Sequence, residues 1–272
     1  MQAASRESIS KLSSSFDSVI STLDDASLTT LADELAAVAR LLAGEVTLRK
    51  HLANRADEAA PKQAAVRSLL SSRVSAPTLS LVEAAVSLRW SKSRDLKNAI
   101  QRLARLALIV SAERAGQIEN VEDELFRFSR VLESNSRLAS LLGDPTAAAD
   151  GRIQLLERVL AGKTTSHTAG LLAQTVRGAD GSNLSTVVAD LAELAAARRN
   201  ESVAHVTAPV ALSDGQDARL TAVLSKIYGR KISVQVEVDS SIGGGLVIRL
   251  GDEVIDGSIA ARLSAAAGEI PR

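Results

Sequence analysis

The sequence has no cysteine and few aromatic residues, and each absence excludes kinds of chemistry. None of its 272 residues is Cys, which excludes disulfides, thiolate metal sites and cysteine nucleophiles. Phe, Trp and Tyr together make up 2% of the chain. The three histidines, His51, His167 and His205, are far apart in sequence, whereas a metal site needs several clustered donors. We therefore assign no catalytic residue and expect neither a metal nor a cofactor.

The chain also lacks an excess of charge and a long apolar run. Lys plus Arg and Asp plus Glu number 32 each, whereas nucleic-acid-binding proteins concentrate positive charge and often add stacking aromatics. Nucleic acid is therefore not an expected partner. No run approaches the roughly 20 apolar residues of a spanning helix, and the opening MQAASRESISK has no apolar signal core. The sequence predicts a cytoplasmic chain that meets a membrane only through its partners.

What the sequence does contain is a series of helical stripes, in which apolar residues recur every three or four positions. Helices are predicted over Arg6–Thr22, Lys62–Ser71, Ala76–Leu88 and Arg94–Arg114. Thr30 followed by Asp33 resembles a capping box for a further helix. Pro61 and Pro77 suit first-turn positions, where the missing N–H group costs no hydrogen bond.

The helical part of the sequence repeats after 90 residues. Thr30 corresponds to Asn120, and Glu34 corresponds to Glu124. Further equivalent pairs are Leu42 and Leu132, Leu70 and Leu160, Leu81 and Leu171, Val86 and Val176 and, after a two-residue gap, Leu96 and Leu184. Because polar and charged residues match in the same register as the apolar ones, duplication is favoured over chance.

Residues 201–272 change from helical periodicity to alternation. Ser202–Val210 and Lys231–Val238 alternate as strands, and Ser213-Asp214 caps a helix between them. The predicted fold class is therefore mainly α, with two tandem helical bundles followed by a small C-terminal α/β domain.

Two short apolar runs near the C-terminus predict a hairpin. Residues 246–250 and 253–255 flank Gly251-Asp252, a glycine-containing connection typical of a tight turn. Asp256-Gly257-Ser258 then offers oxygens that can cap a closing helix. Nothing in this stretch is catalytic by residue type.

The same stretch closely resembles the C-terminal signature of the δ subunits of F-type ATP synthases, the family of the oligomycin-sensitivity-conferring protein. The run is GGLVIRLGDEVIDGS, and the residues that carry the resemblance are Gly244, Gly245, Arg249, Gly251, Asp252, Asp256, Gly257, Ser258 and Arg262. The resemblance implies that they belong to a module that binds the peripheral stalk.

The resemblance also implies a domain plan. Members usually have one helical bundle before this module, and the segment from Asn98 resembles their opening helix. Residues 1–97 are then an extra N-terminal bundle, 98–200 a family-type bundle that binds the catalytic head, and 201–272 the stalk-binding module. An added copy of this kind resembles actinobacterial δ subunits, including forms fused to a membrane-anchored stalk segment. The sequence shows no such anchor, so the stalk is expected to come from a separate subunit.

The function that the resemblance implies is that of a non-catalytic stator subunit. Its partners are the N-terminal helices of the ATP synthase α subunits and the b subunits of the peripheral stalk, at the cytoplasmic face of the cell membrane. The candidates for head binding are Leu125, Phe128, Leu132, Leu171 and Val176.

From the residues alone, two other functions stay open. One is a generic helical-repeat scaffold that binds other helices. The other is a nucleotide- or nucleic-acid-binding protein that uses Gly243-Gly244-Gly245, although phosphate-binding glycine loops precede a helix and a strand follows these glycines.

Overall fold

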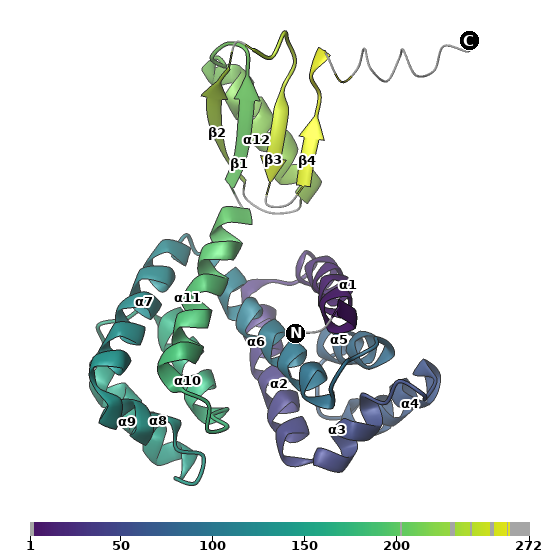
Figure 1. Cartoon of the computed structure of the whole chain (residues 1–272), viewed down its shortest axis with the longest axis vertical. Coiled ribbons are helices and arrows are strands. Elements are labelled where there is room, and N and C mark those ends of the chain that lie inside the picture. Colours follow the sequence, from purple (N-terminus) through teal and green to yellow (C-terminus); the bar gives the residue numbers. More distant parts are fainter. Residues whose placement is uncertain are drawn as a thin grey trace. The chain divides into compact units, whose positions relative to one another are not determined.

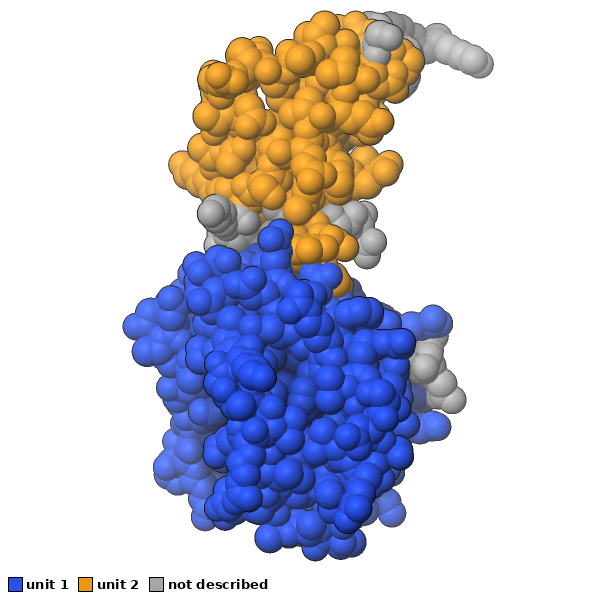
Figure 2. All heavy atoms as spheres, turned by 90° about the vertical axis from the view of Figure 1, so that its left-hand side faces the viewer, with its two compact units in different colours: residues 1–195 blue, residues 196–272 orange. Residues whose placement is uncertain are grey.

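The chain divides into two compact units, residues 1–195 and residues 196–272 (Figure 1, Figure 2). The computed structural model describes residues 3–201, 203–228, 232–239, 241–250, 253–259 and 261. Each unit has its own hydrophobic core.

Helices make up the described part of the first unit, as the periodicity predicted. They are α1 Ala3–Ile20, α2 Asp25–Gly44, α3 Val46–Leu52, α4 Ala59–Leu70, α5 Ala76–Ser87, α6 Ser93–Arg114, α7 Ile118–Ser134, α8 Ser136–Gly143, α9 Ala149–Leu160, α10 Ser166–Arg177 and α11 Leu184–Glu201, the last of which continues past residue 195. Pro61 and Pro77 lie in the first turns of α4 and α5. The predicted mainly α fold is confirmed.

The predicted capping box at Thr30 and Asp33 is wrong. Helix α2 begins earlier, where the carboxylate of Asp24 accepts a hydrogen bond of 2.8 Å from the backbone N–H of Ser27. Thr30 lies inside α2, and its equivalent Asn120 lies inside α7. The helix starts at Asp24 because an acidic residue there satisfies a first-turn N–H group and lies near the positive end of the helix dipole.

The 90-residue repeat recurs in the helix boundaries. Helices α3 and α8 begin at residues 46 and 136, α4 and α9 at 59 and 149, and α5 and α10 at 76 and 166. Helix α1 begins at residue 3 and α6 at residue 93. Figure 1 shows α6 between the helices of the two copies.

A partly buried polar contact repeats in the same register. Glu34 of α2 accepts hydrogen bonds from the N–H and hydroxyl of Ser75, at 3.0 and 2.6 Å, and from the hydroxyl of Thr78 at 2.5 Å. Ninety residues later, Glu124 of α7 accepts from the N–H and hydroxyl of Thr165, at 3.1 and 2.9 Å. In each copy a carboxylate thus satisfies the N-terminal groups of a neighbouring helix.

Helix α6 lies at the centre of the first unit. It packs against α1, α2, α3 and α5 on the N-terminal side of the repeat, and against α7 and α10 on the other. Each residue from Leu106 to Ala112 is buried. One continuous core therefore includes residues from both copies.

The second unit is a small sheet with one helix packed on it. Its elements are β1 Val203–Ala208, α12 Asp214–Tyr228, β2 Ser233–Val238, β3 Val247–Leu250 and β4 Glu253–Asp256. The strand order is β2-β1-β3-β4, with β1 parallel to β2 and the other pairs antiparallel. Leu224 of α12 packs on Ala204 and Val206 of β1. The predicted strands, intervening helix and hairpin are confirmed.

Candidate functional site

The paired glycines of the C-terminal signature lie where the chain passes close to itself. Gly245 has a φ of +84°, which only glycine adopts readily. A Cβ added to it would overlap the carbonyl oxygen of Gly257 and lie 2.9 Å from the Cα of Ser258. The backbone N–H groups of Gly257 and Ile259 donate to the carbonyls of Leu246 and Gly244, both at 2.9 Å. The signature thus joins the start of β3 to the end of β4.

The residues after β4 form the predicted cap. The hydroxyl of Ser258 accepts a hydrogen bond of 3.1 Å from the N–H of Ala261, and Asp256 accepts one of 2.9 Å from the N–H of Ser258. Hydrogen bonding to Ser258 lowers the pKa of Asp256, so this carboxylate is ionised at neutral pH. Both side chains therefore order the turn out of the hairpin.

These contacts bear on the phosphate-binding alternative. The backbone of residues 257–259 lies against Gly244 and Gly245, so the space that a phosphate would need is filled by the chain itself. The glycines serve close backbone packing, as expected where a strand follows them.

The signature residue Arg249 lies on the open face of the sheet, opposite the face that α12 covers. It pairs with His205 of β1 on one side and with Val254 of β4 on the other, and all three are exposed. Gly251, Asp252 and Arg262 lie outside the described residues. The structure thus brings the signature residue Arg249 to an accessible surface of the module.

The five side chains predicted to bind the head are core residues. Leu125, Phe128, Leu132, Leu171 and Val176 are all at most 6% exposed. They pack inside the first unit and are not accessible to a partner in this conformation. Their role in head binding stays a prediction.

Exposed apolar residues, which the sequence analysis did not single out, repeat on the surface of the first unit. Leu41 of α2 and its equivalent Val131 of α7 are 40% and 44% exposed. Leu69 of α4 and its equivalent Val159 of α9 are 47% and 37% exposed. The sequence could have revealed these residues, because the 90-residue register pairs apolar residues that lie off the buried stripe. Surface apolar residues at matching positions are candidates for docking a partner.

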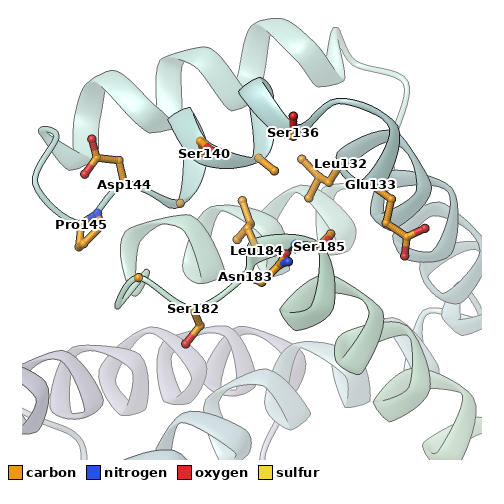
Figure 3. Close-up of a pocket in the computed structure, with 13 residues that line it drawn as sticks. Leu132, Glu133, Ser136, Ser140, Asp144, Pro145, Ser182, Asn183, Leu184 and Ser185 are labelled. Atoms are coloured by element: carbon orange, nitrogen blue, oxygen red, sulfur yellow. Dashed lines mark hydrogen bonds between the residues drawn. The ribbon is translucent and has the colours of Figure 1, made fainter.

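A groove of about 730 Å³ opens in the second copy of the repeat (Figure 3). It is lined by the end of α7, by α8 and by the start of α11. Leu132 and Leu184 lie between Glu133 and Asp144, which stand towards opposite ends of it. Hydrogen bonds from Thr146 lower the pKa of Asp144, so the groove carries negative charge at neutral pH.

The described residues also bear on metal binding and on membrane spanning. Within them no group of three or more His, Cys, Asp or Glu side chains is placed to hold a metal ion. No helix in the same part of the chain combines the length and apolar composition that crossing a membrane requires.

Comparison with known proteins decides the family. The family model for the ATP synthase delta (OSCP) subunit matches residues 101–270. The chain belongs to the ATP synthase delta (OSCP) subunit family. The predicted resemblance is confirmed, and the match covers both the second copy of the helical repeat and the C-terminal module of this delta-family chain.

Relatives named "ATP synthase subunit b-delta" extend the match to the whole chain. Those of Mycobacterium sp. (strain KMS) and Mycobacterium sp. (strain JLS) are each 48% identical over 271 residues, which is 100% of this chain and 61% of theirs. The delta-family chain thus spans about three fifths of the length of these curated relatives.

One solved structure also matches. A chain of the Toxoplasma gondii mitochondrial ATP synthase hexamer is 20% identical, and the match covers 62% of this delta-family chain and 96% of that one. The TM-score is 0.31, which is too low to support an argument about the fold.

Proposed function

We propose that this chain is a non-catalytic stator subunit of a proton-translocating F-type ATP synthase. The observation that carries the proposal is the family match over residues 101–270, together with whole-chain similarity to subunits named b-delta. A rotary motor needs its catalytic head held still against the torque of the central shaft. A chain with two separate binding ends supplies that link without any chemistry of its own.

The proposed division of labour assigns one partner to the helical repeat and another to the C-terminal module. Residues 1–97 and 98–200 are two copies of a helical bundle that binds N-terminal helices of the α subunits on the catalytic head. Residues 201–272 bind the peripheral stalk b subunits. The start of the family match at residue 101 supports the division near residue 98.

The repeated apolar residues support head binding by both copies. Leu41 and Leu69 in the first copy, and Val131 and Val159 in the second, offer similar apolar positions on equivalent helices. Amphipathic helices bind such surfaces through a few apolar anchors. Two linked contacts raise the retention of the head because the second binding step is intramolecular.

The location follows from the partners. The chain sits at the cytoplasmic face of the cell membrane as a peripheral part of the synthase, held there by the subunits that it binds.

Co-purification from membranes tests the proposal. A tagged chain, extracted in mild detergent, is expected to bring α, β and stalk subunits in constant ratio through two purification steps. Recovery of the chain without synthase subunits would overturn the proposed function.

A pair of double variants then tests head binding. Val131→Asp with Val159→Asp, and separately Leu41→Asp with Leu69→Asp, are each expected to weaken capture of a peptide of the α N-terminus at least tenfold. Val223→Asp is the control, because Val223 is similarly exposed, at 45%, but lies on α12 of the other unit. Unchanged capture by both double variants would refute head binding through these residues.

A further inference from the structure

The two copies of the repeat differ at the groove beside α8. The groove lies between α7, α8 and the start of α11, and the equivalent region of the first copy lies between α2, α3 and the start of α6. Because the copies share one register, residues 90 positions apart can be compared directly. The first copy therefore shows which side chains of the chain itself can fill this region.

In the first copy two arginines reach across the equivalent region. The guanidinium of Arg49 on α3 donates to the carbonyls of Leu42 and Ala43 at the end of α2, at 2.9 and 3.4 Å. Its Nε atom is fully enclosed. Arg55 donates a hydrogen bond of 2.7 Å to the carbonyl of Trp90, in the loop before α6. Arginine thus satisfies carbonyls at the C-terminal, negative end of a helix.

In the second copy neither arginine is present. The residue equivalent to Arg49 is Ala139, and the residue equivalent to Arg55 is Pro145, and neither side chain can donate a hydrogen bond. Both line the open groove. The carbonyls equivalent to those that Arg49 binds belong to Leu132 and Glu133, which also line it.

The charge of the groove complements a cation. Glu133 and Asp144 line it, and none of its lining residues is Lys or Arg. Glu133 forms an ion pair of 2.6 Å with Arg130, but both side chains are largely exposed, so the pair is weak and can exchange partners. The apolar side chains of Leu132 and Leu184 lie between the two carboxylates (Figure 3).

We propose that the groove beside α8 binds an arginine-bearing peptide segment of another subunit, which supplies the guanidinium that Arg49 supplies in the first copy. The partner's arginine donates to the end of α7 and pairs with Glu133, at the mouth of the groove. This inference rests on the proposed function, because it takes the partner from the synthase to which the chain belongs.

Site-specific photo-crosslinking within the purified synthase tests the inference. A photoreactive amino acid replaces Ser140, which lines the groove and is exposed, and in the control it replaces the equivalent Lys50 of the first copy. The expected product from position 140 is a crosslink to one peptide of another subunit, with an arginine within a few residues of the crosslinked site. Position 50 is expected not to capture that peptide.

Two variants of the groove complete the test. Ala139→Arg with Pro145→Arg restores the residues of the first copy and is expected to reduce the crosslink from position 140 at least tenfold. Glu133→Gln leaves the groove open and is expected to reduce it several-fold. Trp90 fluorescence and helical circular dichroism check that each variant is folded.

The outcomes separate the inference from the function on which it rests. If the chain does not purify with the synthase, the proposed function and the inference both fail. If it does, a crosslink only within the chain, to a second copy of it, or to a peptide without arginine overturns the inference alone. A crosslink that neither groove variant weakens overturns it as well.

Discussion

Replacing Gly245 with alanine is expected to unfold the C-terminal module while leaving the helical unit intact. Gly245 has a φ of +84°, which costs a residue with a Cβ about 1–2 kcal/mol. The added Cβ would also overlap the carbonyl oxygen of Gly257, so the backbone of residues 257–258 must move. Overpacking of this kind typically costs a further 1–3 kcal/mol. The total, about 2–5 kcal/mol, is comparable to the whole stability of a domain of this size.

Neighbouring glycines give a graded control series. At Gly243 an added Cβ meets no atom within 4 Å, so Gly243→Ala is expected to be close to neutral. At Gly257, which has no left-handed φ, the Cβ would lie 3.1 Å from the carbonyl oxygen of Leu246. Gly257→Ala is therefore expected to fall between the other two variants, and a bulkier Gly257→Val should cost more.

Hydrogen exchange of the intact chain measures the effect on each unit. In Gly245→Ala, the amides of β1 and β3 are expected to lose protection against exchange. The unfolding transition of the first unit, measured by the fluorescence of Trp90, is expected to stay unchanged. Capture of a stalk peptide should fall in parallel, and capture of an α N-terminal peptide should persist. Equal protection of the module in Gly243→Ala and Gly245→Ala would refute the reasoning.

Three further predictions concern the helical unit and the absence of catalysis. Burial acts to raise the pKa of Glu34, but hydrogen bonds from Ser75 and Thr78 outweigh it and lower that pKa below 4.5. Because the folded-state pKa is depressed, the stabilisation is present above the unfolded pKa and is lost as the pH falls. The melting temperature of Glu34→Gln should therefore lie below that of the parent chain at pH 7, and the difference should shrink as the pH falls below the ordinary pKa of a glutamate; a constant difference would contradict this. Limited proteolysis should cut near Asn200–Val203 and leave the helical part before the cut as one protected fragment, whereas early cuts within that fragment would count against a single unit. The purified chain should show no saturable ATPase activity, because its sequence has no phosphate-binding loop with its lysine, and turnover in a clean preparation would disprove this.

The sequence predicted the elements well because their periods are unambiguous. Apolar residues at helical spacing marked α4 to α6 to within three residues, and the apolar runs on either side of Gly251-Asp252 marked β3 and β4. The misplaced cap at Thr30 shows the limit of such patterns. Several polar residues near a helix start can serve as caps, and in α2 Asp24 is the one whose carboxylate reaches the first-turn N–H groups.

The candidate surfaces were harder to predict because an apolar stripe marks a core and a docking face alike. Leu125 and Phe128 lie on the stripe of α7 and are buried, whereas Val131 lies off it and is exposed. Which of these positions faces solvent depends on where the neighbouring helices pack, and no local pattern contains that information. The groove depends on missing side chains at Ala139 and Pro145, and it becomes visible only when the two copies are compared at equal positions.

Helix α6 explains why duplication gives one unit in the structure. As the first helix of the second copy, α6 is equivalent to α1 in the 90-residue register. As the last helix of the first copy, it is equivalent to α11 once the two-residue gap in the register is included. A helix that served only one bundle would keep a solvent-exposed face. Residues Leu106 to Ala112 are instead buried over nearly two turns, between α2 on one side and α7 and α10 on the other. Neither copy can lose α6 without exposing its own core, so the two should unfold together. For a subunit proposed to resist torque, this arrangement joins the two copies through one shared helix.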